Sequence, residues 1–215
     1  MKRILCPSMM CAQYSYLADE VRMLDEAGAD IFHIDIMDGA FVPNFAMGLE
    51  DFKCIRQTTK KLIDVHLMVE NPETAVRIFT QAGADILYVH AEYKGNIAEI
   101  LENIREEGAS PGIAVNPDTT VEQITKLLPL VDYILIMTVH PGFAGQTYIE
   151  LVNTKLQQLV ELKDKYHFYI IVDGAISPEK IRNLSEMGVD GFVLGTSALF
   201  GKEKSYCEIL NELRN

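Results

Sequence analysis

Four side chains that can bind a metal lie at the ends of three separate apolar segments. His33 and Asp35 belong to IFHIDIMDG, His66 to LIDVHLMV and Asp173 to FYIIVDG. Residues i and i+2 of a strand point to the same face, so a strand over the first segment would place His33 beside Asp35. Two imidazoles and two carboxylates brought to one point suit a divalent transition metal. A single residue of this kind is usually a core or turn residue, but four of them at strand ends indicate a metal site.

Apolar segments typical of strands recur along the chain and alternate with amphipathic stretches typical of helices. The expected strands are 4–9, 31–37, 62–69, 86–90, 112–115, 133–139, 169–173 and 191–195. The clearest helical stretches are 16–27, 72–82, 97–107, 121–128, 148–165, 178–187 and 204–213. Strict alternation predicts a parallel sheet with right-handed crossovers. Eight units favour a closed (β/α)₈ TIM barrel over an open doubly wound sheet, and a barrel carries its site at the carboxyl ends of the strands.

Three joints between a helix and the next strand share one pattern. Residues 27–30, 82–85 and 187–190 each consist of an apolar residue, Gly, another apolar residue and Asp. Glycine at the end of a helix readily adopts the left-handed conformation that stops the helix. Because no linker or low-complexity segment divides the chain, we expect one domain over residues 1–215.

Composition restricts the classes of partner. The chain has 215 residues, of which 48% are hydrophobic, enough for one α/β core. A net charge of −12 argues against sequence-independent binding of nucleic acid and against binding to anionic membranes. The four cysteines show no CxxC spacing, which favours reduced thiols and a cytoplasmic location. No apolar segment is long enough to predict a membrane span.

Glycine-rich turns follow the last three expected strands. The segment 141–146 (PGFAGQ) follows the sixth strand, Gly174 follows the seventh, and 195–197 (GTS) follows the eighth. Backbone N–H groups in such turns and at helix starts bind anions, and barrels often hold phosphate at these last loops. PGFAG alone is more often an ordinary turn, but together the three loops predict a phosphate-binding region.

Six longer segments carry a more specific signal. They are Cys6-Pro7-Ser8, HIDIMDGAFVPN (33–44), DVHLMVENP (64–72), MTVHPGFAGQ (137–146), VDGAI (172–176) and GTSALF (195–200). Together they resemble the ribulose-phosphate 3-epimerase family over the whole chain. The resemblance implies a (β/α)₈ barrel, one divalent metal (Zn²⁺, Fe²⁺, Co²⁺ or Mn²⁺), inversion at C3 of a ketose phosphate, and a homo-oligomer.

The resemblance also implies roles for individual residues. His33, Asp35, His66 and Asp173 match the family's metal ligands, and the two aspartates also match its catalytic acid–base pair. Ser8 and His66 match contacts to the substrate. The positions that match the segments holding substrate and phosphate are Gly142, Phe143, Ala144, Gly145, Gly174, Ala175, Gly195, Thr196 and Ser197. The methionines that match site-lining positions are Met37, Met68 and Met137. Ordinary filling of the barrel is the alternative interpretation of these methionines.

The reaction that the resemblance implies agrees with this residue set. Inverting a carbon beside a carbonyl requires removal of a proton from one face and delivery of a proton to the other. Two opposed carboxyl groups, Asp35 and Asp173, do this without turning the substrate, and they exchange roles with reaction direction. A metal would act as a Lewis acid on the cis-enediolate intermediate, and a methionine cap would keep water away from it.

A few positions depart from ribulose-phosphate epimerases proper. His140 and Ala144 stand where those enzymes usually carry Asn and Gly, and Ala175 replaces a second Gly after Asp173. Several segments look more like the D-allulose-6-phosphate 3-epimerase branch, namely Met10-Cys11, 137–139 (MTV), 143–145 (FAG) and 195–197 (GTS). We therefore expect a slight preference for D-allulose 6-phosphate and D-fructose 6-phosphate, with D-ribulose 5-phosphate and D-xylulose 5-phosphate as the alternative. A metal-dependent sugar-phosphate hydrolase and a non-catalytic sugar-phosphate-binding barrel are more distant alternatives.

Overall fold

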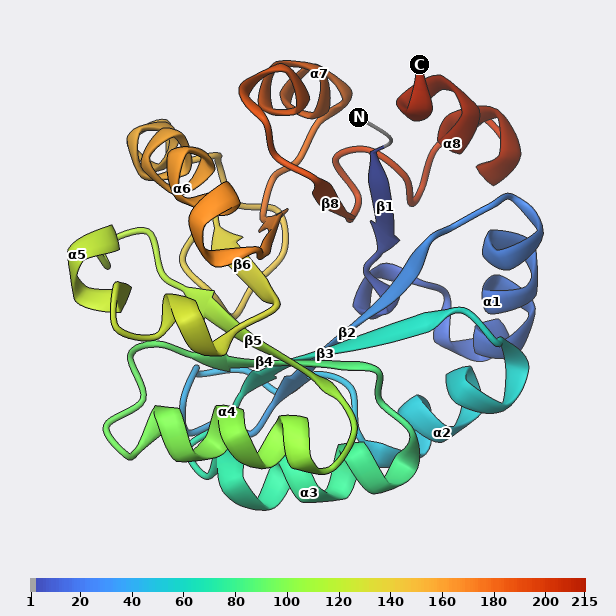
Figure 1. Cartoon of the computed structure of the whole chain (residues 1–215). Coiled ribbons are helices and arrows are strands. Elements are labelled where there is room, and N and C mark those ends of the chain that lie inside the picture. The colour runs from blue at the N-terminus through green and yellow to red at the C-terminus, as the bar shows by residue number, and fades with distance from the viewer. Residues whose placement is uncertain (1–2) are drawn as a thin grey trace.

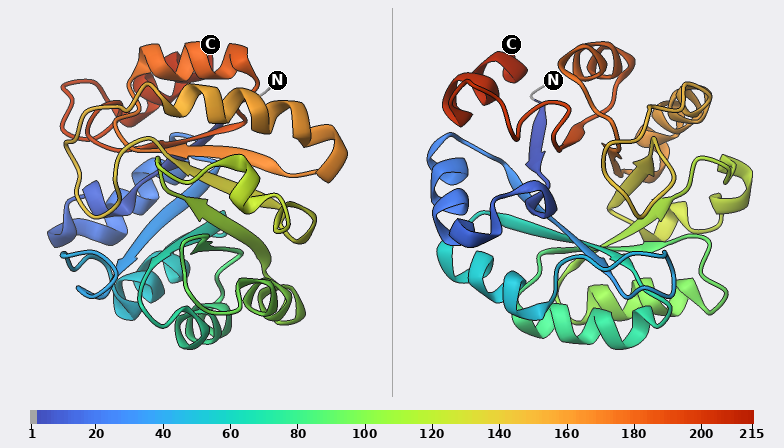
Figure 2. Two further views of the ribbon diagram at one scale, coloured as in Figure 1. Left: turned by 90° about the vertical axis from the view of Figure 1, so that its left-hand side faces the viewer. Right: turned by 180° about the vertical axis from the view of Figure 1, so that it is seen from behind.

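The computed structural model describes residues 3–215, and within them eight parallel strands form one sheet that curves into a (β/α)₈ barrel (Figure 1). The strands are β1 Ile4–Pro7, β2 Ile31–Met37, β3 Leu62–Met68, β4 Ile86–His90, β5 Ser110–Val115, β6 Tyr133–Met137, β7 Tyr169–Asp173 and β8 Gly191–Leu194. The helices are α1 Leu17–Glu26, α2 Leu49–Thr58, α3 Pro72–Ala82, α4 Ile97–Glu106, α5 Val121–Ile124, α6 Val152–Tyr166, α7 Pro178–Met187 and α8 Tyr206–Arg214. The predicted fold class is confirmed. Figure 2 shows the helices outside the strands from two further directions.

The barrel closes between β1 and β2, which are the two ends of the hydrogen-bonded strand order β1-β8-β7-β6-β5-β4-β3-β2. An isolated parallel bridge joins Ser8 to His33 across this seam. The backbone N–H of Asp30 also donates to the carbonyl of Leu5 at 3.0 Å. The closure therefore brings Ser8 next to the strand that carries two of the predicted metal ligands.

The predicted strands agree with the observed ones to within two residues at each end, but three helices differ from prediction. Helix α2 was not among the helical stretches that we named; it begins after Gly48, whose N–H donates to the Asp51 carboxylate at 2.8 Å. Helix α6 begins at Val152, later than predicted, because the backbone N–H of Ile149 donates to the carbonyl of Thr138 and not to a carbonyl one helical turn earlier. The stretch 121–128 divides into α5 and a 3-10 segment that contains Pro129, since proline cannot continue the helical hydrogen bonding.

Alternation along the strands separates an outer core from the barrel interior. Phe32, Ile34 and Ile36 face the helices, as predicted, and belong to the core between sheet and helices. The interior below the site is filled by a second cluster that includes Tyr88 and Tyr133. Gly112 makes room for this filling, because a Cβ there would lie 2.5 Å from the Tyr88 ring. Among the described residues, no helix combines the length and the apolar character needed to cross a membrane.

An aspartate precedes each even-numbered strand and ties it to the preceding odd-numbered strand. The four backbone N–H bonds run from Asp30 to Leu5, Asp85 to Ile63, Asp132 to Pro111 and Asp190 to Ile170, at 2.9–3.0 Å. Three of the carboxylates also accept the N–H of the same partner, with distances of 3.0 Å for Leu5, 2.8 Å for Ile63 and 2.8 Å for Ile170. Pro111 has no N–H, so Asp132 lacks this second bond. We call these four residues the aspartate clamps.

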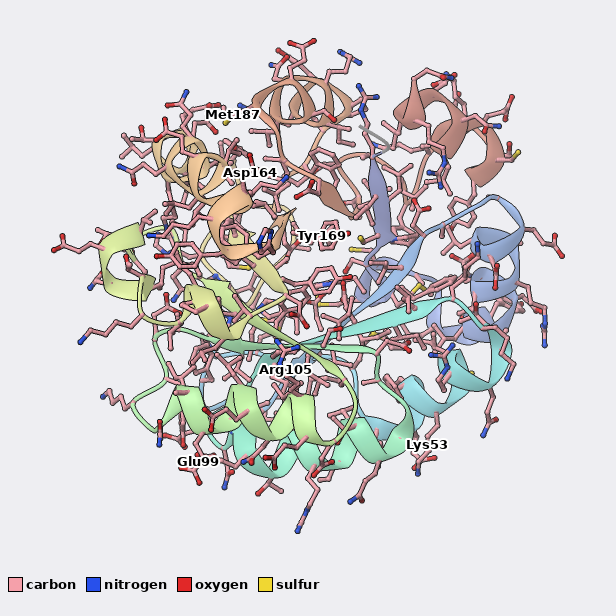
Figure 3. The ribbon with its side chains drawn as sticks, viewed as in Figure 1. Lys53, Glu99, Arg105, Asp164, Tyr169 and Met187 are labelled. Carbon is pink, nitrogen blue, oxygen red and sulfur yellow. The ribbon has the colours of Figure 1, made fainter. Side chains whose placement is uncertain are left out.

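Each aspartate clamp also pairs with a basic side chain. The pairs are Asp30 with Arg214, Asp85 with Arg56, Asp132 with Arg105 and Asp190 with Lys163, at N···O distances of 2.6–2.9 Å. Figure 3 labels Arg105 of α4 in this group and also Lys53 and Glu99 on the outer surface of the helices. The clamps lie at the amino ends of their strands, so they fix the end of the barrel opposite the predicted site.

Candidate active site

The four predicted metal ligands converge at the carboxyl ends of three strands. Strand β2 carries His33 and Asp35, β3 carries His66, and β7 ends at Asp173. One ligand atom from each residue lies within 4.8 Å of the others. Both imidazoles are fully buried, and Asp35 is 4% exposed. The structure therefore brings together the four side chains that the sequence predicted to lie close to one another.

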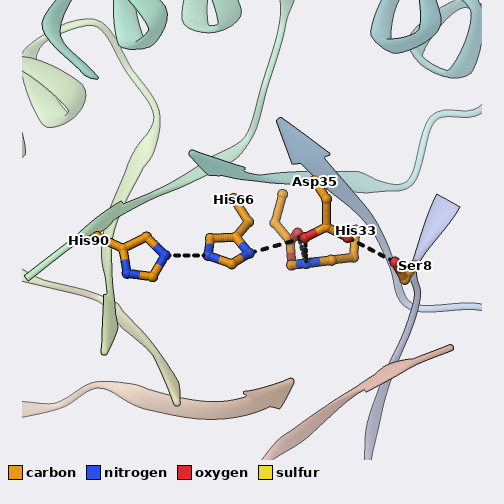
Figure 4. Close-up of polar contacts among 6 residues, drawn as sticks. Ser8, His33, Asp35, His66 and His90 are labelled. Atoms are coloured by element: carbon orange, nitrogen blue, oxygen red, sulfur yellow. Dashed lines mark hydrogen bonds and ion pairs between the residues drawn. The ribbon is translucent and has the colours of Figure 1, made fainter. Parts of the chain in front are cut away.

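Hydrogen-bonding atoms crowd around one oxygen of Asp35. His33 Nε2 lies 3.2 Å and His66 Nδ1 lies 3.1 Å from Asp35 Oδ1, and the hydroxyl of Ser8 donates to Oδ2 at 2.9 Å (Figure 4). His33 Nδ1 contacts the buried Asp64 carboxylate at 2.5 Å, which leaves the Nε2 lone pair of a neutral ring directed at Asp35. Lone pairs that converge in this way repel one another unless a cation or a proton lies among them, so the donor set fits a divalent metal.

The electrostatics of the site favour positive charge. Burial lowers the pKa of His33, but the carboxylates of Asp64 and Asp35 outweigh burial and raise the pKa well above its usual value. His66, which is equally buried, has a lowered pKa because burial outweighs its contact with Asp35. Negative charge at this point therefore attracts a proton to His33 and would attract a metal ion in the same way.

The two aspartates have pKa values shifted in opposite directions. Burial alone raises the pKa of Asp35, but the charge of His33 and its hydrogen bond with Asp35 outweigh burial and hold the pKa below its usual range. Burial and the negative charge of Asp35 raise the pKa of Asp173 to about 7. Two carboxyl groups held in different protonation states are what a pair of base and acid requires.

A pocket opens above Asp35 and Asp173 and gathers the other predicted site residues. Its lining includes the predicted substrate-binding residues Ser8, Gly142, Phe143, Ala144, Gly145, Gly174, Ala175, Gly195, Thr196 and Ser197. It also includes the predicted methionines Met37, Met68 and Met137, together with Met10. The glycine-rich loops after β6, β7 and β8 thus meet the two aspartates in one space. The methionines lie on the wall of this pocket and also belong to buried apolar clusters, so their role in the site stays a prediction.

Two loops meet across the mouth of the pocket. The side chain of Asn44, from the loop after β2, donates to the carbonyl of Gly142 at 2.6 Å. Gly142 has φ +120°, and a Cβ there would lie 3.2 Å from Val42. A glycine is therefore required both by the backbone conformation and by the close approach of the opposite loop.

Sequence reasoning missed residues that surround the ligands. His90, to which the sequence analysis assigned no role, is buried, and its Nε2 lies 2.8 Å from His66 Nε2. His90 Nδ1 in turn contacts Glu92 at 3.0 Å. A signal was present, because His90-Ala91-Glu92 repeats at the end of β4 the histidine–x–carboxylate spacing of His33 and Asp35.

Comparisons with known proteins identify the family. The Ribulose-phosphate 3 epimerase family model matches residues 4–200. A ribulose-phosphate 3-epimerase of Synechocystis sp. is 40% identical over 99% of this chain and 93% of its own length. The Bacillus subtilis protein of the same name is 37% identical over 95% of this chain and 97% of its own length.

Solved structures at lower identity show the same fold. A 3-hexulose-6-phosphate synthase superposes with a TM-score of 0.70 at 17% identity, covering 100% of this chain and 98% of that one. A thiamine phosphate pyrophosphorylase from Pyrococcus furiosus has a TM-score of 0.67 at 20% identity, covering 99% and 95%. The fold, the paired aspartates and the sequence matches agree that the chain belongs to the ribulose-phosphate 3-epimerase family and is an isomerase, a ketose-phosphate 3-epimerase.

Proposed function

We propose that this enzyme interconverts D-ribulose 5-phosphate and D-xylulose 5-phosphate. The observation that carries the epimerase chemistry is the pair Asp35 and Asp173, which meet in one pocket with pKa values shifted in opposite directions. The pentose substrate is supported by the relatives, because those that match over nearly the whole chain are named ribulose-phosphate 3-epimerase. They favour this alternative over the hexose phosphate that we expected from single positions in the loops.

Two of the departures from ribulose-phosphate epimerases proper are single alanines in the loops, Ala144 and Ala175. Ala175 has φ +51°, a left-handed conformation that glycine adopts more easily, so the alanine follows the path that a glycine would take there. Ala144 lies on an exposed part of its loop. Neither methyl group therefore gives a physical reason for a displaced phosphate position.

In the proposed mechanism His33, Asp35, His66 and Asp173 hold one divalent metal ion. When bound, the ion supplies a Lewis acid that stabilises negative charge developing on the substrate oxygens. The carboxylate of Asp35 removes the C3 proton from one face, and the carboxyl group of Asp173 delivers a proton to the other face. In the reverse direction the two residues exchange roles.

Other residues of the chain prepare this proton transfer. The Ser8 hydroxyl donates to Asp35 Oδ2, which leaves Oδ1 oriented toward the two imidazoles. Met37, Met68 and Met137 present apolar sulfur-containing surface without an exchangeable proton, so they limit access of water to the reacting carbon. The loops after β6, β7 and β8 are proposed to bind the phosphate through backbone N–H groups.

The substrate assignment is tested by comparing kcat/KM for D-ribulose 5-phosphate and D-allulose 6-phosphate with purified, metal-loaded protein. We expect a preference for the pentose of a hundredfold or more, which corresponds to about 2.7 kcal/mol of differential transition-state binding. Equal values, or a preference for the hexose, would contradict the pentose assignment and leave the reaction class intact.

The same assay separates the more distant alternatives. Release of inorganic phosphate from either sugar would indicate the hydrolase. Binding without exchange of the C3 hydrogen for solvent deuterium would indicate a non-catalytic barrel. The expected homo-oligomer, the cytoplasmic location and the choice among Zn²⁺, Fe²⁺, Co²⁺ and Mn²⁺ stay predictions from the sequence.

A further inference from the structure

A chain of contacts leads from the candidate metal site to a carboxylate that the proposed mechanism does not use. His66 Nδ1 faces Asp35 at 3.1 Å, and His66 Nε2 lies 2.8 Å from His90 Nε2 (Figure 4). His90 Nδ1 then contacts Glu92 Oε2 at 3.0 Å. We call His90 and Glu92 the His–Glu relay.

The histidines of this chain are held in place by burial and ring packing. His66 is fully buried, and His90 is 1% exposed. Their ring centroids lie 5.0 Å apart, and the ring of Phe41 packs on the other side of His90 with centroids 4.8 Å apart. Because neither ring can turn away without opening the core, the contact between the two Nε2 atoms is a fixed feature of the site.

This contact permits only one hydrogen atom. Two bare nitrogen lone pairs at 2.8 Å would repel, and two N–H groups would collide, so one Nε2 donates and the other accepts. Two orders are therefore possible for a pair of neutral rings. Either His66 donates from Nε2 and keeps a lone pair on Nδ1, or His90 donates and His66 carries its hydrogen on Nδ1, pointing at Asp35.

Glu92 selects between these orders. Its Oε1 accepts the backbone N–H of Asn116 at 2.9 Å and the hydroxyl of Thr119. Burial raises the pKa of Glu92, but the hydrogen bonds from His90, Thr119 and Asn116 outweigh burial and lower the pKa, so the group is a carboxylate that can only accept. His90 must then donate from Nδ1, which leaves a lone pair on its Nε2 and requires the hydrogen on His66 Nε2.

A buried lysine fixes the loop that holds Glu92. Lys155 of α6 is 7% exposed, and its ammonium group donates to the carbonyls of Asn116 and Pro117. These bonds hold the Asn116 N–H in the position where it donates to Glu92. The backbone N–H of Asn116, in the loop after β5, thus fixes which atoms donate and which accept along the chain from Glu92 to His66.

We propose that Glu92 and His90 are positioning residues that set the tautomer of His66 and keep its Nδ1 lone pair available to the divalent metal. The proposal deepens the proposed function, because it rests on the role of His66 as a metal ligand. Carboxylates that orient a metal-bound histidine through its second nitrogen are a general device. Here Glu92 does not contact His66 directly. It fixes which nitrogen of His90 donates, and His90 in turn fixes which nitrogen of His66 carries hydrogen.

The substitution Glu92→Gln tests this order directly. The fixed N–H of Asn116 requires the amide oxygen of Gln on its side, so the amide NH₂ faces His90 Nδ1 and donates to it. His90 must then donate from Nε2 to His66, and His66 carries its hydrogen on Nδ1. We expect a 10–100-fold loss of Zn²⁺ affinity, the range found for partners that orient metal ligands.

Two measurements are needed, neither of which depends on turnover. The ¹⁵N chemical shifts of the imidazoles in metal-free protein report which nitrogen of His66 carries hydrogen, and calorimetric titration reports Zn²⁺ affinity. We expect an unprotonated Nδ1 on His66 in the wild type and a protonated one in Glu92→Gln. Glu102→Gln, the same change on the exposed face of α4, is the matched control and should alter neither result.

The outcomes separate this proposal from the proposed function. A wild type that binds no Zn²⁺ would count against the metal site itself. A wild-type protein that binds Zn²⁺ but carries hydrogen on His66 Nδ1 in its metal-free form would overturn the His–Glu relay and leave the proposed function intact. A Glu92→Gln variant that binds Zn²⁺ as tightly as the wild type would do the same. If Glu92→Gln does not fold, the wild-type spectrum still decides the question.

Discussion

Asp35 and Asp173 show how two identical side chains acquire different properties within one site. Asp35 faces the ring of His33, whose charge and hydrogen bond favour the ionised form of the carboxyl group. Burial and the charge of Asp35 act on Asp173 instead and raise its pKa to about 7. Metal-free protein near neutral pH therefore holds one ionised carboxylate and one carboxyl group that retains its proton part of the time. A bound cation would favour ionisation of both.

This difference predicts opposite effects of two Asn substitutions on the stability of metal-free protein. Because the pKa of Asp173 is raised on folding, the folded state binds a proton that the unfolded state loses, and stability falls as pH rises from about 4 to about 7. Asp173→Asn removes this penalty and should stabilise the protein at pH 8 by roughly 1–2 kcal/mol, with no gain at pH 4. Urea unfolding at the two pH values measures the effect.

Asp35→Asn is the matched comparison. The pKa of Asp35 is lowered on folding, so its contribution is present above about pH 4 and is lost as pH falls; the substitution should destabilise the protein at pH 8. Both variants should lose turnover by at least about 10²-fold because each lacks one member of the base–acid pair. A stability gain from Asp35→Asn, or more than a tenth of wild-type turnover in both variants, would argue against these assignments.

The candidate metal ligands could be predicted from the sequence more completely than the residues that hold those ligands in position. His33, Asp35, His66 and Asp173 were predictable because strand alternation and barrel topology bring strand ends together. The partners Asp64 and Glu92 were harder to assign, since their roles depend on which nitrogen of a neighbouring ring faces them. The role of Glu92 depends further on the backbone of Asn116 in another loop. Neither dependence is visible in local residue patterns.

At the level of elements, the aspartate clamps explain why strands so short keep a fixed register. Asp85 binds the N–H of Ile63 and the guanidinium of Arg56, each at 2.8 Å, and thereby joins β3, β4 and α2. The joint motif that ends in Asp was visible in the sequence for Asp30, Asp85 and Asp190. Asp132 lies outside that motif, and its interaction with Arg105 was found only in the structure.

The clamps predict a difference between two similar substitutions. Asp85→Ala leaves the Ile63 N–H without its side-chain acceptor and removes the ion pair with Arg56, so it should reduce the free energy of unfolding by about 1–3 kcal/mol. Asp132→Ala removes an exposed ion pair beside Pro111, which has no N–H to satisfy, and should cost less than about 1 kcal/mol. Urea unfolding compares the two, and kcat/KM should change in neither, since both clamps lie at the end of the barrel opposite the site. Equal losses of stability would contradict the role given to the Ile63 bond.

At the level of the whole molecule, the barrel is filled in layers that end in the site. Tyr133 and Tyr169 stack at the amino ends of β6 and β7, aliphatic residues follow, and the polar residues occupy the opposite end. Eight alternating units were enough to predict this architecture. The closing contact between Ser8 and His33 was not predictable, because it depends on how far the whole sheet curves.

Metal binding should stabilise the whole fold. A ligand that binds only the folded state adds RT ln(1 + [L]/Kd), about 2.7 kcal/mol at a hundredfold excess over Kd. We therefore expect a chelator to lower Tm in calorimetry and added Zn²⁺ to restore it. Mg²⁺, which prefers oxygen ligands, is the control and should have little effect on a site with two imidazoles. A Tm that changes neither with the chelator nor with added Zn²⁺ would contradict the metal site.

The aspartate clamps have a consequence for how this chain can be divided. The N–H of a clamp binds the odd-numbered strand before it, whereas the carbonyls of Asp85, Asp132 and Asp190 accept the N–H groups of Ser110, Tyr169 and Ile4 in the neighbouring pair of strands. One ion pair also spans the two ends of the sequence, because Arg214 of α8 binds Asp30. The clamps therefore fasten the pairs of strands to one another around the barrel. A chimera with a relative keeps these fastenings only where both boundaries of the exchanged segment retain the matching residues.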